Sequence, residues 1–312
     1  MSGVRVFAPA SIGNVAAGFD LLGAALAPLD GTLLGDVVRV EPSASDRFGL
    51  EGPYAPMLAG DARPNLVTRA LELFRERSGV RLPWSVTLEK NLPVNSGLGS
   101  SASSVVAALA AFQEACGAPL GGMELLELAG RAEGLYSGSA HLDNVAPSML
   151  GGLRMVVPGS EGRPSARELP WPGDLVFVVV HPDFQLPTAR SRAALPAAVP
   201  LEGAVAFAGN LAAFVHALHT GDRSLLGRSL RDPLAEPFRA PLVPGFRRAQ
   251  ARALEAGALG FSLSGSGPSV FAVALEDRAA SVAAAVAEAF TMEGLGSRSW
   301  LCGLDTQGAR LL

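Results

Sequence analysis

The hydrophobic positions of this chain fall into two kinds of stretch that alternate along its 312 residues. Short stretches of alternating or β-branched apolar residues predict strands at 4–7, 37–40, 84–88, 149–157 and 175–180, a hairpin-like pair over 260–273, and a last strand at 300–301. Longer stretches with helical spacing predict helices at 65–78, 105–112, 121–138, 203–220, 246–256 and 279–290. Strands and helices therefore alternate, but without the regular rhythm of a doubly wound sheet.

A segment rich in proline, glycine and serine, residues 158–172, separates the two halves of the chain. A length of 312 residues is enough for two domains. We therefore expect an α+β fold with two domains, residues 1–165 and residues 166–312, and we see no internal repeat.

Composition and charge exclude several classes of protein. No apolar run approaches the ~18 residues that span a bilayer, and the N-terminus enters a strand without a signal peptide. The net charge of −4, with acids and bases mixed, gives no nucleic-acid footprint. Cys116 and Cys302 lack metal-type spacing, which favours a reducing, cytoplasmic setting. We expect neither nucleic acid nor a membrane as a partner.

The most informative segment is the loop at residues 93–104, Pro-Val-Asn-Ser-Gly-Leu-Gly-Ser-Ser-Ala-Ser-Ser, which opens onto the apolar helix. Its glycines let the backbone approach a ligand closely. The start of a helix offers free N–H groups and the positive end of the dipole, and the serine hydroxyls add donors. The loop therefore favours an anion, usually phosphate. The alternative is an ordinary helix start.

Lys90 is the only lysine of the chain and stands three residues before this loop. The other 24 of the 25 basic residues are arginine, so this ammonium stands out by composition. A compact point charge serves a phosphate differently from a planar guanidinium. Lys90 is therefore a candidate phosphate contact, and the alternative is a leftover surface residue.

Further polar residues gather in small-residue loops and on predicted helices. Each one alone has an ordinary structural explanation, such as a cap, a turn or an ion pair. Together they supply phosphate donors, a carboxylate for Mg²⁺ and arginines for a substrate with a carboxylate, which are the parts of a phosphoryl-transfer enzyme. These candidates are Asn14, Asp20, Glu133, His141, Asp143, Asn144, Thr188, Arg190, Arg192, Arg239 and the glycine loop 265–267.

Four segments resemble motifs of the GHMP small-molecule kinases, which include galactokinases, homoserine kinases and mevalonate kinases. Residues 93–103 resemble their phosphate loop, and residues 260–268 resemble their third motif. Residues 9–23 and 141–152 are similar to the first and central motifs of the homoserine kinases. One departure is Asn95, which stands where glycine is common.

The resemblance implies an N-terminal domain like the second domain of ribosomal protein S5, a ferredoxin-like C-terminal domain, and an active site between them. It implies ATP and Mg²⁺ as cofactors, L-homoserine as the small-molecule substrate, O-phospho-L-homoserine as a product on the route to threonine, and a homodimer. The alternatives are another GHMP kinase, such as a mevalonate-type enzyme, and a non-catalytic sensor of ATP or an amino acid.

The resemblance also assigns roles by motif position. Ser101 and Glu133 would hold Mg²⁺. ATP would contact Asn65, Lys90, Pro93, Ser96, Gly97, Leu98, Gly99, Ser100, Ser101 and Ser103. Homoserine would contact Asn14, Asp20, His141, Asp143, Asn144, Thr188, Arg192, Arg239 and Gly265, with Arg192 preferred over Arg190 by its spacing to Leu195-Pro196.

The expected catalytic residues are Asn144, Lys90 and Arg192. In several relatives an aspartate acts as the base on the substrate hydroxyl, at the place where this chain has Asn144. An amide takes no proton at neutral pH. The implied mechanism is therefore positioning and charge neutralisation, as a loose phosphoryl transition state requires.

Overall fold

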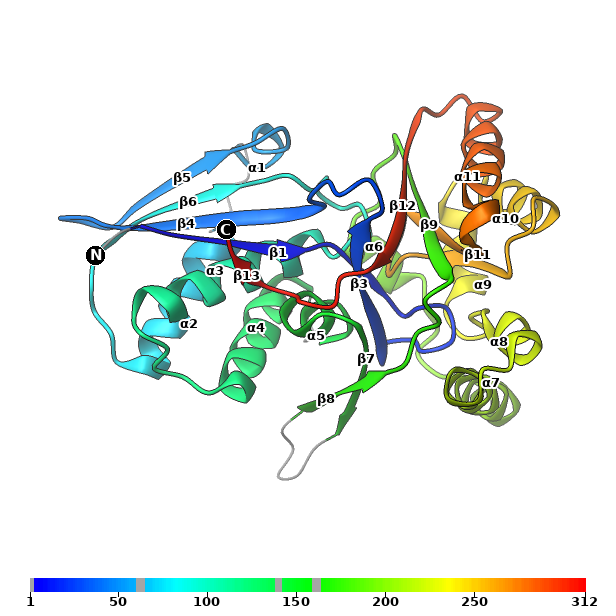
Figure 1. Cartoon of the computed structure of the whole chain (residues 1–312), viewed down its shortest axis with the longest axis horizontal. Coiled ribbons are helices and arrows are strands. Elements are labelled where there is room, and N and C mark those ends of the chain that lie inside the picture. The colour runs from blue at the N-terminus through cyan, green and yellow to red at the C-terminus, as the bar shows by residue number, and fades with distance from the viewer. Residues whose placement is uncertain (1–2, 60–64, 138–141, 159–163) are drawn as a thin grey trace.

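The computed structural model describes residues 3–59, 65–137, 142–158 and 164–312. In this part of the chain, the first sheet has five strands: β1 (Val4–Pro9), β4 (Gly35–Pro42), β5 (Arg47–Glu51), β6 (Trp84–Glu89) and β13 (Arg310–Leu311). Their order is β13-β1-β4-β6-β5, with β5 parallel to β6 and the other pairs antiparallel. This sheet lies on the left in Figure 1.

Helices cover one face of the first sheet. They are α2 (Leu66–Ser78), α3 (Ser100–Ala115), α4 (Gly122–Ser137) and α5 (Leu142–Leu150), which lie below it in Figure 1, while the short α1 (Pro56–Ala59) follows β5. Asn65 caps α2, because its side-chain oxygen accepts a 2.8 Å hydrogen bond from the Val67 N–H. The apolar α3 is buried on nearly every side, as expected of a helix with no polar face.

The second sheet contains eight strands among the described residues. They are β2 (Ser11–Gly13), β3 (Leu22–Pro28), β7 (Leu153–Pro158), β8 (Pro164–Leu169), β9 (Leu175–Pro182), β10 (Gly260–Leu263), β11 (Val270–Leu275) and β12 (Ser297–Leu304). The main order is β10-β11-β9-β12-β3-β7-β8, and β2 pairs with β3. Every pair in this sheet is antiparallel.

The helices of the second half pack around this sheet. α10 (Phe246–Glu255) and α11 (Glu276–Thr291) enclose one apolar cluster with β9, β10 and β11. α7 (Leu201–Thr220) and α8 (Arg223–Ser229) contribute to another, beside β3 and β9. The short α6 (Thr188–Ala193), α9 (Glu236–Arg239) and η2 (Ala240–Leu242) complete the half. Figure 1 shows α10 and α11 at the far right and α7 below them.

The structure confirms the predicted helices and most of the predicted strands, and it corrects two points. The linker expected at 158–172 contains β8, which pairs along its whole length with β7. The strand at 300–301 belongs to β12 and is not the last, because β13 returns to pair with β1. The expected division between residues 165 and 166 falls inside β8, and two domains with these bounds stay a prediction.

One helix of the described chain, α7, is long and apolar enough, by length and composition alone, to cross a membrane. A single helix of this kind is weak evidence for a membrane protein.

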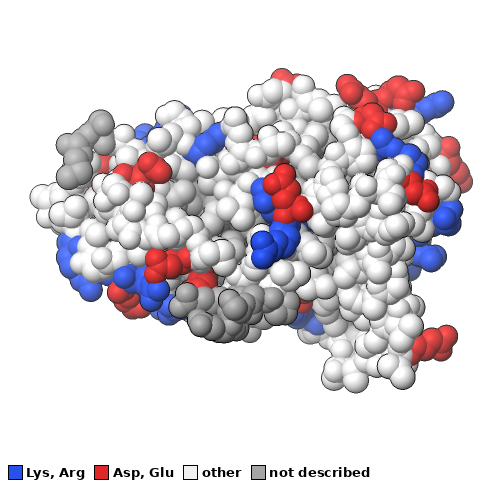
Figure 2. Space-filling model, turned by 60° about the horizontal axis from the view of Figure 1, so that its bottom comes forward, with Lys and Arg blue, Asp and Glu red and all other residues white. Residues whose placement is uncertain are grey.

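Figure 2 shows that charged side chains on one face of the molecule gather near its ends and in a central patch, with wide uncharged areas between them.

Candidate active site

One cavity of about 600 Å³ brings together most of the residues expected at the active site. Its wall combines the loop before α3, the helices α4 and α5, the loop after β2, and the segments at α6 and α9. Of the expected residues, the cavity is lined by Asn14, Asp20, Asn65, Lys90, Ser96, Gly97, Gly99, Ser100, Ser101, Glu133, Asp143, Asn144, Thr188, Arg192, Arg239 and Gly265.

The loop at 93–99 runs directly into α3, and other segments hold its carbonyl groups. The Ser264 hydroxyl donates a 2.6 Å hydrogen bond to the carbonyl of Gly97. The Ser269 N–H donates to the carbonyl of Ser96 at 3.0 Å. Because these carbonyls are engaged with protein, the N–H groups of the loop and of the first turn of α3 suit an anion in the cavity.

Three loop residues have left-handed backbone conformations, Asn95 (φ 56°), Gly97 (φ 81°) and Gly99 (φ 62°). A Cβ atom at Gly99 would lie 2.1 Å from the Ser11 hydroxyl oxygen, so only glycine fits there. Asparagine is among the few other residues that tolerate this conformation. The departure at Asn95 therefore preserves the shape of the loop.

Ser101 and Glu133 meet at the cavity wall. Ser101 lies in the first turn of α3 and Glu133 lies on α4, and the Ser101 hydroxyl donates a 2.7 Å hydrogen bond to Oε1 of Glu133. Mg²⁺ prefers oxygen ligands and commonly takes one or two from protein, the rest coming from water and phosphate. This hydroxyl and carboxylate fit that role. Among the described residues, no cluster of three or more His, Cys, Asp or Glu forms a closed metal site.

Asn14 connects the loop after β2 to two other parts of the cavity. Its backbone N–H donates to Oδ2 of Asp143 at 3.2 Å, and its side-chain nitrogen donates to the Gly265 carbonyl at 3.2 Å. Its side-chain oxygen accepts from the Asp20 N–H at 3.0 Å. Residues 14–16 all have positive φ, a strained conformation that surrounding contacts must hold. These bonds fix the Asp143 carboxylate and the Asp20 backbone relative to the loop.

Two arginines flank one aromatic ring at the cavity. The guanidinium carbons of Arg192 and Arg239 lie 5.5 and 5.1 Å from the centre of the Phe19 ring. Arg192 pairs with Asp20 at 2.8 Å, and the Arg239 guanidinium donates to the Gly265 carbonyl at 3.1 Å. Burial lowers the pKa of Arg239, an effect that Asp20 opposes. The result is a compact cationic surface with a neighbouring carboxylate.

The amide of Asn144, near the start of α5, is held at both ends. Its oxygen accepts a 3.0 Å hydrogen bond from the Ser11 hydroxyl. Its nitrogen donates to Oδ1 of Asp143 at 3.4 Å. These bonds orient Asn144. Its amide nitrogen is only a hydrogen-bond donor, so this side chain cannot act as the base for a substrate hydroxyl.

The structure does not bring every expected residue to the cavity. Pro93, Leu98 and Ser103 are buried behind its wall; the Ser103 hydroxyl instead donates to the Ala8 carbonyl at 2.8 Å. These three do not line the cavity, and their contact with ATP stays a prediction. His141 lies outside the described residues, and Arg190, the alternative to Arg192, is exposed.

Three kinds of residue in or around the cavity were not predicted from the sequence. Phe19 lies inside the first motif but carries no charge that would mark it. Asp36 lies in an ordinary alternating strand and emerges as the buried partner of Lys90. The third kind is apolar. These residues come from separate segments and form part of the cavity wall only in the folded chain: Phe48, Leu50, Leu58, Leu66 and Leu88.

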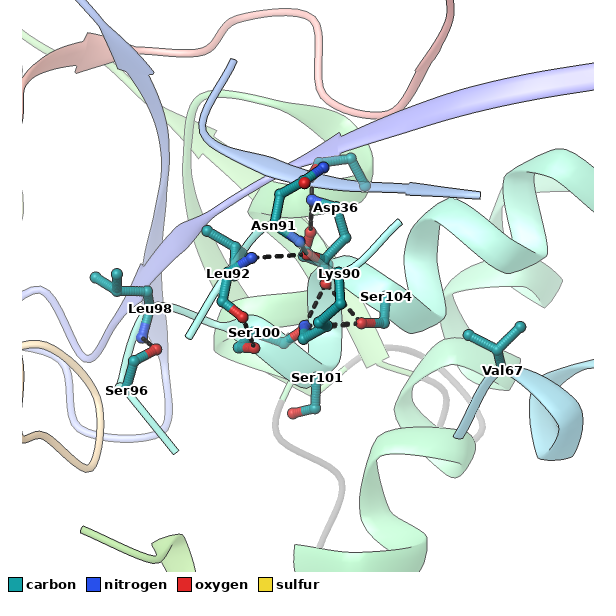
Figure 3. A network of polar contacts seen from close by, with 12 residues as sticks. Asp36, Val67, Lys90, Asn91, Leu92, Ser96, Leu98, Ser100, Ser101 and Ser104 are labelled. Carbon is teal, nitrogen blue, oxygen red and sulfur yellow. Dashed lines mark hydrogen bonds and ion pairs between the residues drawn. The ribbon is translucent and has the colours of Figure 1, made fainter. Parts of the chain in front are cut away.

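The position of Lys90 excludes one of the two interpretations given to it from the sequence. The residue is only 2% exposed, so it is not a leftover surface residue. Its ammonium contacts Asp36, the Ser100 carbonyl and the Ser104 hydroxyl (Figure 3).

Comparison with known proteins agrees with this geometry. Residues 65–152 match the model of the GHMP kinases N-terminal domain, and residues 214–291 match that of the GHMP kinases C-terminal domain. The chain is 36% identical to a homoserine kinase from Cytophaga hutchinsonii, with a TM-score of 0.92 over 100% of this chain and 98% of the other.

More distant structures share the fold. A putative homoserine kinase from Listeria monocytogenes is 22% identical, with a TM-score of 0.70 over 100% of this chain and 99% of the other. A mevalonate kinase from L. major is 17% identical, with a TM-score of 0.69 over 98% and 97%. The family resemblance of the motifs and the two-domain α+β fold are therefore confirmed. Kinases of this family use ATP as phosphate donor, generally with Mg²⁺. The chain belongs to the GHMP family of small-molecule kinases.

Proposed function

We propose that the chain is an ATP-dependent kinase that phosphorylates the side-chain hydroxyl of L-homoserine, giving O-phospho-L-homoserine for threonine synthesis. One observation carries the proposal: a single cavity wall combines the Ser101–Glu133 pair with the two arginines around Phe19. The 36% identity to a homoserine kinase supports the same substrate.

The first half of the cavity suits ATP. The phosphates would lie against the loop 93–99 and the first turn of α3, where N–H groups and the helix dipole favour anions. The apolar side chains near β5 and α1, among them Phe48 and Leu58, suit the faces of a base. Asn65 lines this part, with its oxygen committed to capping α2 and its nitrogen available for a base or ribose.

Ser101 and Glu133 would hold Mg²⁺, which supplies positive charge to the transferred phosphoryl group when it is bound. Ser101 comes from the same helix start that faces the phosphates. The carboxylate of Glu133 therefore lies where it can hold a cation against the phosphate chain.

The second half suits a small amino acid. The guanidinium groups of Arg192 and Arg239 match a carboxylate in the bidentate manner. Asp20 and Asp143 supply negative charge for an ammonium group, and the Asn144 amide and Thr188 hydroxyl add hydrogen bonds. An isoprenoid acid has a carboxylate but no ammonium, so the two aspartates favour an amino acid.

The chemical step needs alignment more than a strong base. The homoserine oxygen forms a bond to the γ-phosphorus while the bond to the β,γ-bridging oxygen breaks, and ADP leaves with those electrons. The hydroxyl proton passes to a phosphate oxygen or to solvent, because Asn144 cannot take it. Asn144 and Arg192 orient the acceptor and neutralise charge in a loose transition state.

The proposal includes a cytoplasmic setting and a second copy of the chain as partner. α7 buries only Phe214, Ala217 and Leu218, while Leu201 and Val205 are 81% and 63% exposed. Two such helices packed antiparallel would set the apolar end at Leu201 against the groove near Val215. In the same register, Val205 of one copy would lie at the level of Leu211 of the other, which lines that groove.

The experiment is the release of ADP from Mg-ATP, measured with L-homoserine and, in parallel, with mevalonate, galactose and L-threonine. Release with homoserine alone is the expected result. Release with mevalonate or galactose instead would keep a GHMP kinase and overturn the amino-acid site. ATP binding without release to any acceptor would favour a sensor over an enzyme.

A further inference from the structure

A buried ion pair lies behind the phosphate loop and connects both of its ends (Figure 3). Asp36, on β4, is fully buried, and Lys90, after β6, is 2% exposed. Two oxygens of Asp36 serve different segments. Oδ1 accepts from the N–H groups of Asn91 and Leu92 at 2.8 and 3.0 Å, and Oδ2 accepts from the Lys90 ammonium and from the Ser104 hydroxyl.

The Lys90 ammonium makes three contacts with protein acceptors. It donates to Asp36, to the Ser100 carbonyl at 2.8 Å and to the Ser104 hydroxyl at 3.0 Å. An ammonium has three hydrogens, so its donors are all engaged within the protein. A charge buried this deeply needs its partner, since removing one member of such a pair leaves the other uncompensated. This arrangement leaves Lys90 no donor for a phosphate oxygen.

We infer that Asp36 and Lys90 form a positioning pair that fixes both ends of the phosphate loop, rather than a source of direct phosphate contacts. This inference rests on the proposed binding of ATP at the loop, but not on the identity of the acceptor.

The anchors stand at the two ends of the loop. Asp36 holds the backbone of Leu92, directly before the loop, and the Ser104 side chain, in the second turn of α3. Lys90 holds the carbonyl of Ser100, in the first turn of α3. The Ser100 hydroxyl closes the ring by donating to the Leu92 carbonyl at 3.4 Å. The distance across the loop, from residue 92 to residue 100, is therefore set from behind.

The loop needs such support because three of its residues hold a left-handed backbone conformation. Asn95 has a positive φ, as do Gly97 and Gly99, and asparagine and glycine tolerate this conformation without being restricted to it, so neighbouring contacts must select it. Phosphate binding by backbone N–H groups depends on their relative directions, which small shifts of the loop would spoil. The pair also cancels its own charge, so the anion is attracted by the helix start and not by the lysine.

The test separates a positioning role from a direct contact. If Lys90 bound phosphate itself, Asp36→Asn would free the ammonium, and the affinity for ATP would stay or rise. The inference predicts the opposite: a loss of about tenfold or more in ATP affinity, measured by calorimetry with Mg²⁺ and without acceptor. Glu89→Gln, on the adjacent strand position and in a surface pair with Arg5, is the control and should bind ATP like wild type.

A milder pair of variants covers the case in which Asp36→Asn fails to fold. Ser104→Ala removes the hydroxyl that joins Asp36 to α3, and Ser104→Thr keeps it. We expect Ser104→Ala to raise the Kd for ATP several-fold and the KM for the acceptor hardly at all, with Ser104→Thr recovering most of the loss. A Tm close to that of wild type in both variants separates positioning from general destabilisation.

The outcomes distinguish this inference from the proposed function. Wild-type affinity for ATP in both Asp36→Asn and Ser104→Ala would overturn the inference and leave the kinase proposal standing. A wild-type chain that binds no ATP would overturn both. A chain that binds ATP but does not phosphorylate homoserine would overturn the substrate alone, and the affinity measurements would still decide the role of the pair.

Discussion

Ser101 and Glu133 are 32 positions apart in the sequence, yet the Ser101 hydroxyl donates a 2.7 Å hydrogen bond to the Glu133 carboxylate at the cavity wall. The bond joins the first turn of α3 to α4. It therefore connects the helix start that suits phosphate to a carboxylate that suits a cation, and these are the two requirements of a phosphoryl-transfer site.

Glu133→Gln tests the cation site. The amide keeps the size of the side chain and an oxygen for Ser101 but removes the negative charge that would hold Mg²⁺. We expect kcat to fall on the order of 100-fold, with a higher Mg²⁺ requirement, in steady-state assays at several Mg²⁺ concentrations. Glu124→Gln, on the same helix in a surface pair with Arg77, should keep its activity. Equal activity of both variants would exclude Glu133 as a ligand.

Arg239→Lys tests the carboxylate site. The lysine keeps a positive charge but cannot present two parallel N–H groups, so the bidentate match to a carboxylate is lost. We expect the KM for homoserine to rise about tenfold and the KM for ATP to change little. The control is Arg248→Lys, whose residue pairs with Glu293 away from the cavity. An unchanged KM for homoserine would give Arg239 a structural role.

Phe19→Leu tests the ring between the two arginines. Leucine fills much of the volume but has no π face for the guanidinium groups of Arg192 and Arg239. The expected result is a rise of about three- to tenfold in the KM for homoserine, with a smaller change in kcat. A fall in kcat without any change in KM would contradict a role in substrate binding.

His181 makes the stability depend on pH. It lies on β9, and its Nδ1 is 3.0 Å from the Ser269 hydroxyl, whose residue also holds the phosphate loop. Burial lowers the pKa of His181 to about 4, an effect that Asp183 opposes and Arg298 adds to. The unfolded chain takes up a proton near pH 6.5 and the folded chain does not, so this stability is present above that pH and is lost as the pH falls toward 4.

We therefore expect His181→Gln to flatten the decline of stability between pH 6.5 and pH 4. The wild-type slope from this group is at most about 1.4 kcal/mol per pH unit, measured by urea unfolding at several pH values. Parallel curves for His181→Gln and wild type would show that the histidine is not buried in its neutral form.

Val205→Lys tests the proposed contact between two copies through α7. A charge in the centre of an apolar helix pair is costly to bury, so the variant should be monomeric at concentrations where wild type is a dimer. Light scattering with size-exclusion chromatography gives the mass directly. Leu254→Lys, at a similarly exposed position on α10, should leave the dimer intact. A monomeric wild type, or a dimer that survives in Val205→Lys, would exclude this interface.

The sequence predicted those parts of the molecule that local chemistry encodes. Adjacent glycines and hydroxyl side chains predict the phosphate loop, and Asn65, which caps α2, predicts the start of that helix. Most of the expected ligands line the cavity because each lies within a recognisable motif.

Contacts between distant segments were beyond such reasoning. Asp36 and Lys90 are 54 positions apart, and nothing in an alternating strand shows that its aspartate will be buried against a lysine. Phe19 gains its role only when two helices bring arginines to its ring. β8 escaped because its proline-rich surroundings are typical of a linker, whereas pairing with β7 decides its structure.

Identifying the product formed from Mg-ATP and L-homoserine by ³¹P NMR decides the proposed activity. We expect one new phosphomonoester on the side-chain hydroxyl, formed in step with ADP, with the amino group unmodified. The proposed activity would be contradicted if homoserine stayed unphosphorylated while mevalonate, galactose or L-threonine was phosphorylated in a parallel reaction.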